Sequence, residues 1–178
     1  MWRRFFNPLH LSPLGDEETG LAGVEYLIQR LDEEIARSHR HGHHLVLIIL
    51  SLKGLTSLSF ADQSRTLTCA AADLRQTMRR NDVIAHLGGG RFALLLTEAR
   101  PEFAYPKAVR VAAGLGEACN QTLNADLVHV EFGMTVYEES LRDALAMLAQ
   151  AEVNLQSRYT PEEPDEEPQD EGQPSSEA

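Results

Sequence analysis

Three consecutive glycines and an arginine, residues 88–91, separate two apolar runs in the sequence VIAHLGGGRFALLL. Glycines adopt backbone conformations that can bring successive N–H groups onto a phosphate, so a turn of this composition could bind an anion. The same pattern is also typical of two strands joined by a tight turn. The stretch is therefore a working site, a site that has lost its function, or a structural turn.

The composition limits the classes of protein to which the chain can belong. Its 178 residues suggest one domain with additional segments, and 43% of them are hydrophobic, which is enough for a core. The net charge of −11 argues against a nucleic-acid-binding protein, which needs a clustered basic face. Eight of the acids lie in the last 19 residues, which contain no lysine or arginine. The rest of the chain is consequently close to neutral.

The ends of the chain differ in composition from its centre. We expect an N-terminal segment over residues 1–15 that is disordered or docks on a partner, and a disordered acidic, proline-rich tail over residues 160–178. The first residues lack the apolar stretch of a signal peptide, and no run reaches the roughly 18 apolar residues of a membrane span. These features predict a cytoplasmic protein with one domain over residues 16–159.

The elements that position the glycine turn follow from hydrophobic periodicity. Helices are predicted over about 21–41, from about 60 to Arg79-Arg80, from Pro101 to about 118, and over about 141–155; strands are predicted over 44–52, 83–87, 91–97 and 126–137. The central order β-α-β-β-α-β is the split βαβ arrangement of ferredoxin-like folds. The predicted fold class is therefore α/β (α+β), with a mainly antiparallel sheet flanked by helices.

Five stretches in this order resemble the GGDEF domain, the diguanylate cyclase module of bacteria. They are DEETGL at 16–21, LVLIILSLKGL at 45–55, RRNDVIAHLGGGRFALLL at 79–96, VHVEFGMTV at 128–136 and LAQAEVNLQSR at 148–158. The resemblance implies the GGDEF type of ferredoxin-like fold for residues 16–159. It also implies descent from an enzyme that joins two GTP molecules into cyclic di-GMP with the help of metal ions.

The residues that the family uses for catalysis are replaced in this chain. The signature Gly-Gly-Asp/Glu-Glu-Phe reads GGGRF, with Gly90 in place of the metal-binding acid and Arg91 in place of the next acid. Ser51 aligns with the aspartate that closes the first strand, Lys53 with a second aspartate, and Ser59 approximately with a guanine-contacting asparagine. Hard cations prefer carboxylate oxygens, which these positions lack. We therefore predict an inactive domain without a metal or cofactor.

The resemblance implies a second site, because the family often binds cyclic di-GMP at an R-x-x-D motif five residues before the paired glycines. Arg79 and Asp82 have this spacing, Arg80 follows Arg79, and Arg110 lies about where the family adds an arginine, with Lys107 one turn earlier. Arginine can bind phosphate or stack on guanine, and aspartate can accept from the guanine edge. Alternatively, the two arginines simply suit the dipole at a helix end.

Two functions remain open at this point. One is a cyclic di-GMP receptor, and the other is a GGDEF-derived interaction or scaffold module that binds no nucleotide. Either would act through an unidentified protein partner, such as a membrane-associated secretion or motility complex, or through a homodimer. An Asp82 that is open to ligand favours the first function, whereas an Asp82 paired inside the protein favours the second. The histidine run at 39–44 could bind a transition metal, although a solvated loop is the simpler interpretation.

Overall fold

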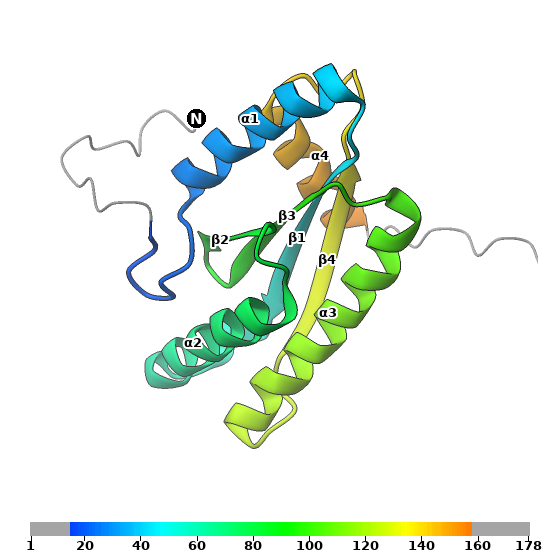
Figure 1. The fold of residues 1–178 in the computed structure, drawn as a ribbon. Helices are drawn as coiled ribbons and strands as arrows, with labels where there is room; N and C mark the ends of the chain where they lie inside the picture. Colours follow the sequence, from blue (N-terminus) through cyan, green and yellow to red (C-terminus); the bar gives the residue numbers. More distant parts are fainter. Residues whose placement is uncertain (1–14, 158–178) are drawn as a thin grey trace, which may run out of the picture.

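The central element of the fold is a strand, β1, whose apolar side chains face both sides. The structure, a computed structural model, describes residues 15–157 (Figure 1), so the predicted segments 1–15 and 160–178 lie outside it apart from Gly15. The elements in chain order are α1 (Val24–His41), β1 (Leu45–Lys53), the 3₁₀ turn η2 (Leu55–Ser57), α2 (Phe60–Thr77), β2 (Val83–Gly88), β3 (Arg91–Thr97), α3 (Pro101–Leu123), β4 (His129–Val136) and α4 (Ala144–Ser157). None of these helices is long and apolar enough to cross a lipid bilayer.

The four strands form one sheet in the order β2-β3-β1-β4, and each neighbouring pair is antiparallel. Strand β1 lies inside the sheet because its residues from Leu45 to Leu50 are almost completely buried and need neighbours at both edges and on both faces. This strand order with its intervening helices is the split βαβ arrangement. The predicted fold class, α/β (α+β) with an antiparallel sheet flanked by helices, is confirmed.

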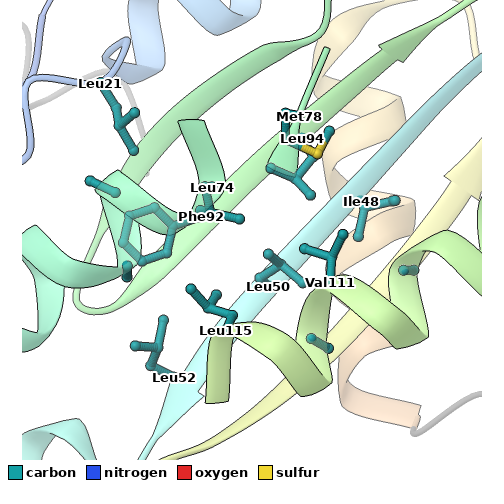
Figure 2. Packing of buried hydrophobic residues seen from close by; sticks show 14 of the residues in the cluster. Leu21, Ile48, Leu50, Leu52, Leu74, Met78, Phe92, Leu94, Val111 and Leu115 are labelled. Atoms are coloured by element: carbon teal, nitrogen blue, oxygen red, sulfur yellow. The ribbon is translucent and has the colours of Figure 1, made fainter. Parts of the chain in front are cut away.

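The alternation of side chains along β1 divides the apolar core into two layers. Ile48 and Leu50 face α2 and α3, whereas Leu47 and Ile49 face α1 and α4. Figure 2 shows the first layer, in which the β1 side chains pack with Leu74 of α2, Val111 and Leu115 of α3 and Phe92 of β3. The sheet therefore carries one pair of helices on each face, and α2 and α3 lie side by side (Figure 1).

The DEETGL stretch forms a tight turn before α1. Leu21, which the periodicity places in the helix, therefore lies ahead of it. Asp16 Oδ1 accepts hydrogen bonds from Thr19 N–H at 2.8 Å and from Thr19 Oγ1 at 2.7 Å. His86 Nδ1 of β2 lies 3.0 Å from the same oxygen, although the ring is not aligned for a hydrogen bond. Burial alone would raise the pKa of Asp16, but the Thr19 hydrogen bonds and His86 outweigh it and hold the pKa below its ordinary value.

Helix α2 ends at Thr77, before the predicted end at Arg79-Arg80. Met78 N–H donates the last helical hydrogen bond, to Leu74 O, and the chain then turns toward β2. The predicted β4 and the predicted start of α4 were also too long, because side chains hold the flanking residues outside these elements, whereas α3 extends to Leu123, beyond its predicted end at about residue 118. Asn120 Oδ1 accepts from Leu127 N–H and Val128 N–H ahead of β4, and Asp32 Oδ1 accepts from Ala144 N–H where α4 begins.

The two cysteines, which are 50 residues apart in sequence, lie at the same α2–α3 interface. Cys69 Sγ accepts a hydrogen bond from Thr122 Oγ1 at 3.1 Å and lies 3.5 Å from Ala118 O. Cys119 is completely buried, and its burial, with a smaller contribution from Cys69, raises the pKa of its thiol to about 12. Both cysteines are free, so they contribute to packing between the two helices.

Candidate functional site

The glycine turn joins β2 to β3 through Gly89 and Gly90. Their φ angles are 60° and 75°, and a type I′ hairpin turn requires positive φ at both central residues. Gly88, with φ of 85°, lies at an irregularity in the β2–β3 register. The predicted pair of strands with a tight turn is therefore confirmed, and the backbone of the hairpin explains all three glycines.

Ser51 and Arg91, which the resemblance aligns with acids of the family, lie side by side at one end of the sheet. Ser51 of β1 lies opposite Arg91 of β3 and opposite Glu131 of β4. Residues directly opposite one another share a face of an antiparallel sheet, so the three side chains form one row on the side of α4. They line a cleft of about 610 Å³ together with Lys53, His129, Glu152, Leu155 and Gln156.

The charged residues of this cleft pair with one another. Arg91 Nη1 lies 2.8 Å from Glu152 Oε1 of α4, and Lys53 Nζ lies 3.3 Å from Glu131 Oε2. Each of the two carboxylates therefore faces a cation that would repel a metal ion. Within residues 15–157, which include the histidine run, no three His, Cys, Asp or Glu side chains are placed to hold a metal.

Gly90 leaves no space for a side chain. A Cβ atom at this position would lie 2.6 Å from Leu55 Cδ2 and 3.6 Å from Leu52 Cβ. Leu55, in η2, is buried in the layer formed with α2 and α3, so moving it would disturb that packing. A side chain at position 90 would therefore require Leu55 to shift.

Ser59, which aligns approximately with the guanine-contacting asparagine, has a structural role at the start of α2. Its Oγ accepts a hydrogen bond from Asp62 N–H at 3.2 Å and donates to Asp62 Oδ2 at 2.8 Å. This is the geometry of a helix N-cap, which satisfies a backbone donor that the helix itself leaves free. Ser59 therefore stabilises α2.

The R-x-x-D stretch forms a tight turn between α2 and β2. Asp82 N–H donates to Arg79 O at 3.1 Å, and Arg79 N–H donates to Asp82 Oδ2 at 3.2 Å. The Arg79 and Arg80 side chains are exposed. The turn thus presents two arginines to solvent while it holds the aspartate close to the backbone.

Asp82 has a second partner on α3. Lys107 Nζ lies 3.0 Å from Asp82 Oδ2, and the Asp82 side chain is only 5% exposed, against 24% for Lys107. Asp82 is therefore paired inside the protein, which is the arrangement that favours a domain without nucleotide. Arg110, three residues after Lys107, is exposed on the same helix.

Arg80 and Asp82 also border a groove of about 570 Å³ whose opposite wall is α1. Helix α1 contributes Arg30, Arg37 and the buried Glu34 to this groove. Glu34 Oε1 lies 2.7 Å from Arg30 Nη2 and 3.5 Å from Arg37 Nη1. The sequence alone did not point to these residues. Their spacing of three and four indicates ion pairs along a helix, but only the packing of α1 brings them to Arg80.

A protein family and a curated relative are similar to this chain. A family described as "Diguanylate cyclase, GGDEF domain" matches residues 14–159. The diguanylate cyclase DgcP of Pseudomonas aeruginosa is 34% identical over 87 residues, which are 47% of this chain and 13% of DgcP. The chain therefore spans only a small part of the length of this curated relative.

The fold is similar to that of several solved structures. The GGDEF domain of DgcB from Caulobacter crescentus, in complex with c-di-GMP, superposes with a TM-score of 0.73 at 14% identity, covering 84% of this chain and 91% of that one. Diguanylate cyclase SiaD from Pseudomonas aeruginosa, in complex with its activator SiaC, gives a TM-score of 0.67 at 24% identity, covering 80% and 56%. At these identities the likeness concerns the fold.

Proposed function

The chain belongs to the GGDEF diguanylate cyclase family, and from this premise we propose that it is a non-catalytic member that binds cyclic di-GMP instead of making it. The observation that supports a loss of catalysis is the set of residues at the cleft at the end of β1. The lining residues Ser51, Lys53 and Arg91, and the adjacent Gly90, offer no carboxylate. The two carboxylates of the cleft, Glu131 and Glu152, are paired with Lys53 and Arg91. Phosphoryl transfer from GTP depends on cations that neutralise the triphosphate, and this cleft has no set of ligands for them.

Binding of cyclic di-GMP is supported by the exposed guanidinium groups around the Arg79–Asp82 turn. Arg79 and Arg80 are exposed on the turn, and Arg110 is exposed on α3. Guanidinium groups bind phosphate through parallel hydrogen bonds and stack on purine faces, so they suit a cyclic dinucleotide. The related GGDEF domain of DgcB was solved in complex with c-di-GMP. In this chain the binding residues would be Arg79, Arg80, Asp82 and Arg110.

A second candidate function is an interaction module that binds no nucleotide. The observation that favours it is the ion pair of Asp82 with Lys107, since a paired aspartate is less available to a guanine. For both functions we propose that the output passes through contacts with another protein. We propose that the domain acts in the cytoplasm on a partner such as a membrane-associated secretion or motility complex, with a homodimer as the alternative.

The test is calorimetric titration of the purified full chain with cyclic di-GMP, and with GTP and Mg²⁺ in parallel, followed by chromatography for the product. We expect binding of cyclic di-GMP at micromolar concentration or below, and no cyclic di-GMP made from GTP. Arg79→Ala should weaken binding about 10- to 100-fold, because a hydrogen bond to a charged group contributes about 1.5–3 kcal/mol. Arg142→Ala is the matched control, as Arg142 is an exposed arginine outside the turn and α3.

Three results would contradict parts of this proposal. Synthesis of cyclic di-GMP by the purified protein would show that the cleft is still catalytic. Absence of heat with cyclic di-GMP would exclude the receptor and leave the interaction module. An equal loss of affinity in Arg79→Ala and Arg142→Ala would indicate general electrostatic attraction and no defined site.

A further inference from the structure

One oxygen of Asp82 carries both of the contacts that hold this side chain in place. Oδ2 accepts the hydrogen bond from Arg79 N–H at 3.2 Å and lies 3.0 Å from Lys107 Nζ. The backbone contact lies within the turn, whereas the lysine comes from α3, 25 residues further along the chain. The Lys107 ammonium is therefore the partner that can move away without unfolding the turn.

The ion pair with Lys107 interferes with the way in which a guanine edge would bind this carboxylate. The N1–H and N2–H₂ donors of guanine lie side by side, so they are best accepted by the two oxygens of one carboxylate. The ammonium at Oδ2 occupies one of these two acceptors. The pair is mostly shielded from solvent, with 5% and 24% of the side chains exposed, so water screens it less than a surface pair.

We propose that Lys107 is an internal competitor for cyclic di-GMP at Asp82, and that a guanine binds there only when the Lys107–Asp82 ion pair opens. This inference rests on the proposed function, because it concerns the affinity of the same site. The apparent dissociation constant of a ligand rises in inverse proportion to the fraction of molecules that are competent to bind. Lys107 thus sets the concentration of cyclic di-GMP at which the domain responds.

When the positive charge of Lys107 is removed, the competitor hypothesis and simple electrostatic attraction predict opposite changes in the affinity for cyclic di-GMP. Removing a positive charge near a dianionic ligand should weaken binding if Lys107 attracts the ligand, but it should strengthen binding if Lys107 blocks Asp82. The discriminating variant is Lys107→Met, which keeps an unbranched apolar chain and removes the ammonium. Lys53→Met is the matched control, because Lys53 pairs with Glu131 at 3.3 Å in the other cleft.

The experiment is calorimetry of the full chain and both variants with cyclic di-GMP and with cyclic di-AMP, whose adenines lack the N1–H and 2-amino donors. We expect Lys107→Met to bind cyclic di-GMP about 3- to 10-fold more tightly than the unchanged protein, with no gain for cyclic di-AMP. Lys53→Met should bind like the unchanged protein. Thermal unfolding of each variant establishes that it remains folded.

The outcomes separate this inference from the proposed function. If the unchanged protein binds cyclic di-GMP and Lys107→Met binds equally or more weakly, the competitor role is wrong and the receptor stands. Equal tightening for cyclic di-AMP would also refute competition at the guanine edge. Binding by Lys107→Met alone would support the competitor role and overturn the receptor function of the unchanged protein, whereas binding by neither protein would overturn both.

Discussion

Asp16 illustrates how a single side chain organises the turn that leads into the domain. One of its oxygens accepts from both the backbone and the hydroxyl of Thr19, and His86 of β2 lies beside it. Arg75 Nη2 of α2 donates to Thr19 O at 2.9 Å, so the turn is tied to the α2 side as well. The carboxylate therefore connects the start of the domain to the strand that leads into the glycine turn.

Substitution Asp16→Asn should lower the free energy of unfolding by about 1.5–3 kcal/mol at pH 7, the range for hydrogen bonds to a charged group. The folded pKa of Asp16 is lowered, so this stabilisation is present above the ordinary value of about 3.9 and is lost as the pH falls through the folded pKa. The difference between the two proteins should shrink below about pH 4. Urea unfolding at several pH values measures it, and a constant difference would contradict an ionic role for Asp16.

At the scale of elements, the hairpin of β2 and β3 has the geometry of a tight turn, and its sequence GGGRF contains no acidic residue. The positive φ angles of Gly89 and Gly90 come from the turn, and the strands on either side are paired, with an irregularity in the register between His86 and Gly88. The two glycines differ in their surroundings. A Cβ atom would meet nothing within 4 Å at Gly89, whereas at Gly90 it would collide with Leu55. A substitution at Gly89 therefore tests backbone strain alone, whereas a substitution at Gly90 tests backbone strain together with packing.

We expect Gly89→Ala to cost about 1–2 kcal/mol, since an L-residue pays this amount in the left-handed region. Gly90→Ala should cost a further 1–3 kcal/mol or so because of overpacking against Leu55. In a double-mutant cycle with Leu55→Ala, the additional cost at Gly90 should become smaller, while the cost at Gly89 should stay the same. Chemical denaturation of the single and double variants provides these values. Equal costs at both glycines would show that Leu55 adapts freely.

For the molecule as a whole, β1 joins two apolar layers that neither pair of helices could form alone. Leu50 belongs to the layer with α2 and α3, and Leu47 belongs to the layer with α1 and α4. Both side chains are completely buried. Because both layers share one strand, loss of either layer should unfold the other. The cleft and the Arg79–Asp82 turn are thereby held in one cooperative unit.

Leu47→Ala and Leu50→Ala should each reduce the free energy of unfolding by about 2–5 kcal/mol, the range for truncating a buried leucine. Each variant should still unfold in a single transition, with the same midpoint by circular dichroism and by a fluorescent dye that binds exposed apolar surface. Separate transitions in either variant would mean that the two layers unfold independently. Val153→Ala, at an exposed position on α4, is the control and should change stability little.

The sequence by itself determined the elements and their order, because hydrophobic periodicity and glycine placement are local properties of the chain. It also determined that Ser51, Lys53, Gly90 and Arg91 offer no carboxylate for a metal ion, since this depends only on residue identity. Helix ends were predicted less well, as at α2, where the chain turns at Met78 and side-chain hydrogen bonds then set the turn.

Only the tertiary structure decided what the charged side chains do. The pairs of Asp82 with Lys107 and of Arg91 with Glu152 join residues 25 and 61 positions apart, and the Leu55 methyl group beside Gly90 comes from another element. Such contacts depend on how α3, α4 and η2 pack on the sheet. Periodicity in the sequence does not indicate the distance between side chains of different elements. The partners of each charge therefore followed from packing, whereas the charges themselves followed from the sequence.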